Sequence, residues 1–219
     1  MKYFSLRYSL LTYKLDQLWF PAGIWALFVI VALLLSDKLP TIARGYLGFA
    51  VPLIGGILAA YSILDDPAIE LRFTTPIPAA WILVERLGMI LVVQAVSAWA
   101  FQVFCLAMGL NLAALGGGLG IQMAWLVPTT ALMAIGVAGA LLAAQPMGGA
   151  LLVGVLWLME IILRGWLAFD KIGRYFLVFM RAAYPEVSWL ASNEIAVAGW
   201  TLLLFLVSWA LLRRQERYI

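Results

Sequence analysis

The chain has 219 residues, of which 65% are hydrophobic and 11% are charged. A soluble domain carries about 25% charged residues, so this composition predicts a polytopic membrane protein. The net charge of +3 comes mostly from bases at the ends of hydrophobic stretches, which indicates contact with membrane lipid and not with nucleic acid. The absence of histidine and the single cysteine, Cys105, exclude a disulfide within the chain and disfavour a metal site of imidazole or thiolate ligands.

Residues 2–17 are predicted to form an amphipathic helix that lies on the membrane surface. Apolar side chains fall on one stripe and small polar side chains on the opposite one, with bases at Lys2, Arg7 and Lys14. The alternative is a plain tail next to the first span. This segment is too polar to be the core of a signal peptide, so the span that follows is expected to be retained.

Six hydrophobic stretches follow, each close to the roughly 20 residues that a helix needs to cross a bilayer. They are predicted at 18–35, 47–64, 87–110, 121–144, 147–169 and 194–212. The expected fold is therefore all-α, with six transmembrane helices in a single domain over 1–219. Six spans place both termini on one side. Eight bases fall on that side and six on the other, so the positive-inside rule predicts that both termini are cytoplasmic.

The stretch 65–86, between the second and third spans, is the longest charged interruption in the first two-thirds of the chain. Asp66 can cap a short helix with Pro67 at its first position, where the missing N–H costs nothing. Pro76 and Pro78 then end that helix, because each removes a donor and restricts the residue before it. We expect a short cytoplasmic helix that is contacted by another protein.

An acid and a base, Glu160 and Arg164, lie four residues apart in the fifth span, so they share one helix face and can form an ion pair. Ionisable groups at membrane depth are costly and suggest a function. The alternative is that Arg164 extends to the outer interface and Glu160 only neutralises it.

The segment 170–193 contains two short amphipathic stretches that are separated at Pro185. Neither is long enough to span the membrane. The segment either dips back into the membrane and packs against the spans, as irregular backbone at that depth must, or forms an ordinary surface helix outside.

Glycines occur in groups along the chain, which allows close helix approach and points weakly to oligomerisation. They include Gly116, Gly117, Gly118, Gly120, Gly136, Gly139, Gly148 and Gly149.

Sequence motifs for catalysis are missing from the chain. It has no GxxxxGK[ST] phosphate loop, so it is not expected to hydrolyse ATP as an enzyme of that class by itself. Its serines have no histidine to act as a base. We therefore expect that this chain is not an enzyme.

Taken together, the layout resembles the type-2 class of ATP-binding-cassette (ABC) permeases. The resemblance covers nearly the whole length: an amphipathic N-terminal helix, six spans and a long segment before the last span. Its most specific part is the loop after the second span, where the family carries an acid, a small helix, a proline-containing turn and a base at the start of the third span. In this sequence those features are Asp66, Glu70, Pro76, Pro78 and Arg86.

In that family the short helix is the coupling helix, which docks in a groove of a separate ATPase subunit. The resemblance implies that Ile69, Leu71 and Phe73 are the apolar anchors in that groove. It implies that Glu70 and Arg72 are contacts at its rim. Two ATPase subunits, which bind ATP and Mg, and a second permease copy, identical or related, are the implied partners besides membrane lipid. This chain itself would bind no cofactor.

The resemblance implies an exporter subunit in the cell membrane, and the apolar interior favours a hydrophobic substrate. Two other classes stay open. A structural subunit of a larger membrane complex would have the same six spans without transport. A secondary transporter or membrane enzyme would need several ionisable groups at mid-depth, where the sequence offers Glu160.

Overall fold

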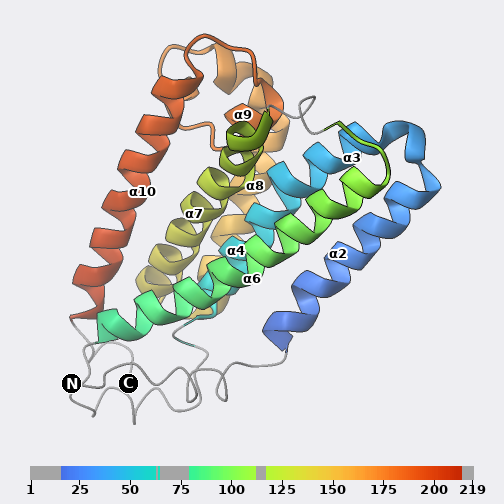
Figure 1. Ribbon diagram of the computed structural model, residues 1–219. Coiled ribbons are helices and arrows are strands. Elements are labelled where there is room, and N and C mark those ends of the chain that lie inside the picture. The colour runs from blue at the N-terminus through green and yellow to red at the C-terminus, as the bar shows by residue number, and fades with distance from the viewer. Residues whose placement is uncertain (1–15, 63, 65–78, 112–116, 214–219) are drawn as a thin grey trace.

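The protein is a helical bundle, seen here in a computed structural model that describes residues 16–62, 64, 79–111 and 117–213 (Figure 1). Every regular element within these residues is a helix. The elements are α2 (Asp16–Leu34), the 3₁₀ turn η1 (Ser36–Lys38), α3 (Leu39–Gly45), the π-helical turn η2 (Tyr46–Ala50), α4 (Val51–Ala60), α6 (Ala79–Ala107), α7 (Gly117–Ala143), α8 (Pro146–Phe169), the 3₁₀ turn η4 (Gly173–Tyr175), α9 (Met180–Ala183) and α10 (Leu190–Leu212).

Five of the continuous helical stretches in the described residues are long and apolar enough to cross a membrane. They are Ser36–Ala60, Trp81–Ala107, Gly117–Ala143, Pro146–Phe169 and Leu190–Leu212. The all-α prediction is confirmed for the described residues, and these five helices are consistent with a multi-pass membrane protein, while the count of six spans stays a prediction. The apolar part of α2, Leu18–Leu34, is also helical but shorter.

Three helix boundaries differ from the predicted spans. The second helical stretch starts before residue 47, because Pro40 lies in the first turn of α3, where a proline loses no hydrogen bond, and so begins a helix. The third starts at Ala79 and not at residue 87, which places Arg86 inside α6. The fourth starts at Gly117 and not at residue 121.

The long helices run alternately in opposite directions between two ends of the bundle (Figure 1). At one end, called here the α9 end, lie the corner between α2 and α3, the start of α7 and the residues between α8 and α10. At the opposite end lie the start of α2, the end of α4, the start of α6 and the end of α10.

The centre of the bundle is α7, which packs against α4, α8 and α10. Small residues make this packing close. A Cβ atom on Gly136 would lie 2.3 Å from the carbonyl oxygen of Gly56 in α4, and a Cβ atom on Gly149 in α8 would lie 2.3 Å from the carbonyl oxygen of Gly136. The backbones of three helices therefore touch at one level, which only glycine permits.

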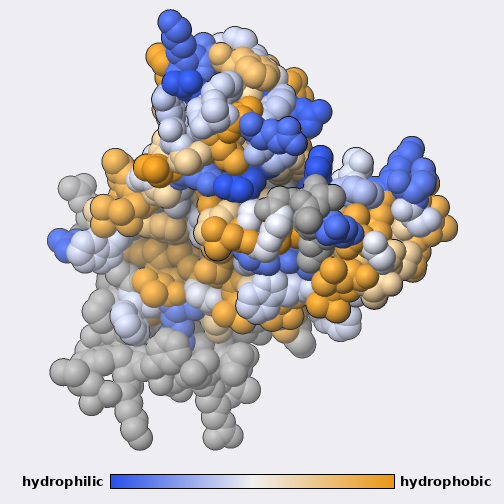
Figure 2. All heavy atoms as spheres, turned by 45° about the horizontal axis from the view of Figure 1, so that its top comes forward, coloured by the Kyte–Doolittle hydropathy of each residue, from blue (hydrophilic) through white to orange (hydrophobic). Residues whose placement is uncertain are grey.

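The outward faces of α6, α8 and α10 are strongly apolar. Large exposed side chains include Val103 on α6, Ile162 on α8 and Leu202 on α10, each more than 60% exposed. In the view toward the α9 end, hydrophobic side chains cover the flanks, while hydrophilic ones gather across the middle and at the tips (Figure 2). This distribution suits a protein surrounded by lipid along its sides.

Candidate functional site

Most of the predicted coupling residues lie outside the described part of the chain. These are Asp66, Pro67, Ile69, Glu70, Leu71, Arg72, Phe73, Pro76 and Pro78. Of the predicted interfacial helix 2–17, the structure describes the last two residues, which form the start of α2.

Arg86, the last of the predicted coupling residues, is described and joins two helix ends. Its Nη1 donates a hydrogen bond of 2.8 Å to the carbonyl oxygen of Ser62, just after α4. The contact ties the start of α6 to the end of α4, at the two points between which the predicted coupling stretch runs.

Residues 170–189, called here the α9 segment, pack into the bundle. Four consecutive side chains, Leu177 to Met180, are at most 3% exposed. Val178 and Phe179 join a cluster with Leu132 of α7 and Val153 of α8. The segment therefore packs against the long helices, and its depth in the membrane stays a prediction.

Side chains of α8 and α10 hydrogen-bond the irregular backbone of the α9 segment. The Glu160 carboxylate accepts from the Val178 N–H, with 2.8 Å between Oε2 and N. Nδ2 of Asn193 donates to the carbonyl oxygens of Arg174, at 2.5 Å, and Leu177, at 2.9 Å. Because buried backbone groups that lack partners are costly, these bonds allow the segment to sit inside the bundle.

Charged groups hold the α9 segment at its first residue, Asp170, and at Arg181 within α9. Oδ2 of Asp170 accepts from the backbone N–H groups of Ile172, at 2.9 Å, and Gly173, at 2.7 Å, and these bonds lower the pKa of the exposed carboxyl. Arg181 forms a two-pronged ion pair with Glu194 of α10, and the hydrogen bond to that carboxylate raises the pKa of the guanidinium. Arg181 is therefore charged at every accessible pH.

The predicted ion pair between Glu160 and Arg164 is not formed in the structure, which describes both residues. Arg164 is exposed on α8. Glu160 instead turns to Val178, because the α9 segment presents a backbone donor to it at that depth. The structure therefore gives Glu160 a backbone partner that the sequence could not indicate.

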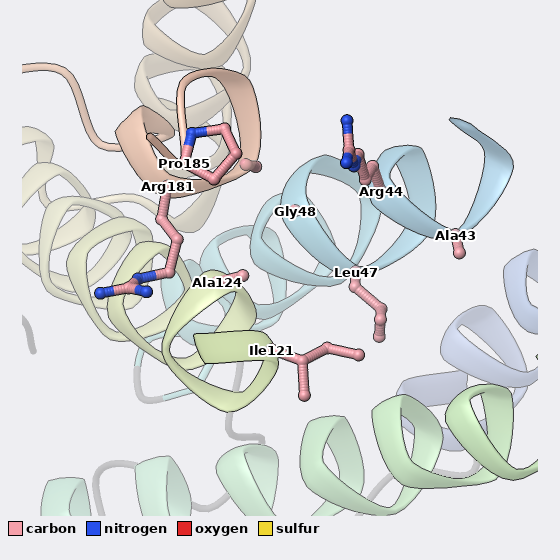
Figure 3. A pocket seen from close by; sticks show the side chains of 9 residues that line it. Ala43, Arg44, Leu47, Gly48, Ile121, Ala124, Arg181 and Pro185 are labelled. Atoms are coloured by element: carbon pink, nitrogen blue, oxygen red, sulfur yellow. The ribbon is translucent and has the colours of Figure 1, made fainter. Parts of the chain in front are cut away.

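A pocket opens at the α9 end, where the end of α3 with η2, the first turns of α7 and the α9 segment meet (Figure 3). Its cavity volume is about 20 Å³, which is close to the space that one water molecule needs. Arg44 and Arg181 lie on opposite sides of it, and Leu47, Ile121 and Ala124 line the part between them. Sequence reasoning missed this site, because its residues come from three segments far apart in the chain.

Polar side chains inside the bundle form a second group that the sequence did not single out. The Tyr46 hydroxyl and Ser97 are hydrogen-bonded at 2.5 Å, which joins η2 to α6. Gln122 of α7 donates to Gln102 of α6 at 2.8 Å. Gln94, fully buried in α6, has no hydrogen-bond partner at either amide atom in the described structure. In the sequence, the polar residues within the apolar stretch that forms α6 could have pointed to this group.

Within the described part of the chain no group of three or more acids, cysteines or histidines could hold a metal ion. No protein-family model matches the sequence, and neither a curated protein nor a solved structure is significantly similar to it. The arrangement offers helix packing, a buried segment and an arginine-lined pocket.

Proposed function

We propose that this chain is the transmembrane subunit of an ATP-driven exporter of the type-2 ABC permease class, with ATP hydrolysed by a separate subunit. In this proposal α2 is the first of six spans, the α9 end faces outward, and the opposite end, with both termini, faces the cytoplasm of the cell. Two copies of the chain, or this chain and a related one, enclose the path of a hydrophobic substrate.

The observation that carries the proposal is where the connection between α4 and α6 is attached. It leaves α4 and returns to α6 at the end of the bundle opposite the α9 segment, and Arg86 joins its two attachment points. An ATPase that bound the predicted coupling stretch would therefore act on two helices at once.

The packing of α4 offers a physical route for that motion. Gly56 of α4 lies against Gly136 of α7 with the backbones in contact, so a tilt of α4 displaces α7. Because α7 also packs against α8, α10 and α9, the displacement would reach the opposite end of the bundle. ATP-driven closure of the two ATPase subunits would thereby change the path between two permease copies.

The first test is purification of the chain from its native membrane in mild detergent, followed by mass spectrometry of the accompanying proteins. We expect a stoichiometric partner with a phosphate-binding GxxxxGK[ST] motif. Other integral proteins in fixed ratio, without any such partner, would instead identify a structural subunit of a larger complex.

A second test reverses the charges of the predicted rim contacts, with Glu70→Arg and Arg72→Glu combined. We expect this variant to insert normally but to lose most of its ATPase association and transport. The matched control is Asp37→Lys with Lys38→Asp, an adjacent exposed pair at the other end of the bundle. Equal ATPase association of both variants and the wild type would refute the coupling assignment.

A further inference from the structure

The helical stretch that contains α3, η2 and α4 changes its winding at η2. The Val51 N–H bonds the carbonyl oxygen of Tyr46, five residues earlier, where an α-helix pairs residues four apart. Pro52 gives a reason for this turn: it has no N–H to donate, and in an α-helix its ring would clash with the carbonyl of Gly48. Such turns are points at which long helices bend, and they are frequent at functional sites.

The two halves of this stretch belong to different parts of the bundle. Before η2, α3 packs against α2 and α6, whereas α4 packs mainly against α7 and α8. At the α9 end, Figure 1 shows α2, α3 and the end of α6 together on one side, with α10 and the residues between α8 and α10 on the other. A bend at η2 would therefore move one group of helices relative to the other.

The α9 segment and α8 hold η2 in place. A Cβ atom on Gly48 would lie 2.4 Å from the Cβ atom of Ala182 in α9, so only glycine permits this approach. Next to it in the chain, the ring of Phe49 lies 5.0 Å from that of Phe179. The indole of Trp157 in α8 donates to the carbonyl oxygen of Phe49 at 3.0 Å. These contacts fix the position of η2 for as long as the α9 segment is seated.

The pocket at the α9 end lies along the seam between the two groups of helices. Residues of α3 and η2 form one wall, and residues of α7 and the α9 segment form the other (Figure 3). Its cavity volume of about 20 Å³ leaves space for about one water molecule, so the seam is closed in this structure. A turn of α3 about η2 would separate the two walls and widen the pocket.

We propose that η2 is a hinge on which α3 and η1 swing away from α7, and that the α9 segment is the latch that holds this hinge closed. Release of the α9 segment from Gly48 would open the bundle at the α9 end, along the pocket. A few residues at the end of a helix are enough to absorb such a motion. The hinge lies within this chain and needs no ATPase, so the proposal is independent of the ATP-driven function proposed above.

The test measures a distance across the seam in the full-length protein, reconstituted in lipid nanodiscs. Nitroxide labels are attached at Asp37→Cys in η1 and Ile195→Cys in α10, both exposed positions, with the buried thiol removed by Cys105→Ala. Pulsed electron paramagnetic resonance gives the distribution of label distances. Gly48→Ala places a methyl group against Ala182 and should shift this distribution to longer distances. Adding Ala182→Gly removes the clash and should restore the wild-type distribution.

Two further variants keep the test decisive. Gly45→Ala adds the same methyl group three residues earlier, where it meets Phe28 at an ordinary 3.8 Å, and should leave the distances unchanged. Trp157→Phe removes the donor to the carbonyl of Phe49 and should shift the distances in the same direction as Gly48→Ala, but less.

Wild-type distances in Gly48→Ala would overturn the hinge. Long distances that persist when Ala182→Gly is added would overturn the α9 segment as its latch. If Gly48→Ala does not fold, Trp157→Phe decides alone, and wild-type distances in that variant would overturn the proposal.

Discussion

The consecutive helices α7 and α8 are similar in length and composition, with 27 and 24 residues and few polar side chains, yet they sit in opposite surroundings. In its most apolar part, 72% of α7 is buried inside the protein, against 11% of α8. Apolar character alone therefore says that a helix enters the membrane and not whether protein or lipid surrounds it there.

The two helices differ in how they are held. On α7, small residues lie on several sides, so α4, α8 and α10 all approach it closely. On α8, the buried contacts fall mostly on one face, along residues spaced three or four apart that include Gly149, Val153, Trp157 and Glu160, and Ala168 is buried near the end of the helix. We expect that close packing along its whole length holds α7 in the bundle, whereas a few individual contacts hold α8.

The largest effect is expected from Gly136→Val in α7. The new Cβ would lie 2.3 Å from the carbonyl oxygen of Gly56, so the helices must separate, at a cost of roughly 3 kcal/mol or more. The matched control is Gly154→Val in α8, where a Cβ meets no atom within 4 Å. Unfolding in SDS, followed by circular dichroism, gives both free energies. Equal losses in the two variants would remove the distinction between the helices.

A smaller loss is expected from Glu160→Leu in α8. It leaves the buried Val178 N–H without its acceptor, which costs about 1 to 3 kcal/mol. Glu160→Gln keeps a carbonyl oxygen at the same place and should lose much less. The same SDS titration, with hydrogen exchange at the Val178 amide, separates the two variants. Equal stability and equal exchange in both would show that this contact does not hold α8.

The sequence predicted the order of the apolar stretches well, because each stretch is a local property of about 20 residues. The sequence could not predict that α7 is more buried than α8, because burial depends on helices that are distant in the chain. Glycines show this directly: Gly136 and Gly149 lie against neighbouring backbone, whereas Gly118, noted for the same reason, has no atom within 4 Å of an added Cβ.

The candidate site was predictable only in part, for the same reason. The four-residue spacing of Glu160 and Arg164 correctly places both on one helix, but the partner of Glu160 is a backbone amide 18 residues away. The pocket between Arg44 and Arg181 depends on the fold of three segments, and no local pattern indicates it.

Trp157→Phe tests the next contact on the buried face of α8. The indole Nε1 donates to the carbonyl oxygen of Phe49 at 3.0 Å, and phenylalanine keeps most of the ring without that donor. We expect a loss of about 1 kcal/mol in the free energy of unfolding. The control is Trp166→Phe, on the same helix but 65% exposed, which should change the free energy of unfolding little in the same SDS titration. If Trp166→Phe lost as much free energy of unfolding as Trp157→Phe, the smaller ring, and not the hydrogen bond to Phe49, would account for both losses.

The smallest effect is expected where α8 ends, at Asp170. Two backbone N–H groups hydrogen-bond the carboxylate and lower its pKa in the folded protein, so the unfolded chain binds a proton at higher pH than the folded one. The stabilisation is therefore complete above the ordinary aspartate pKa of about 3.9 and disappears as the pH falls below it through the pKa of the folded protein.

Asp170→Asn keeps the acceptor oxygen without the charge, so its thermal midpoint should fall less steeply than that of the wild type between about pH 5 and pH 3. Because the carboxylate is exposed, solvent screens it and the difference should be small. Identical pH profiles would mean that the Asp170 hydrogen bonds do not hold α8 to the α9 segment and that its apolar and ring contacts do so instead, which would sharpen the contrast with α7.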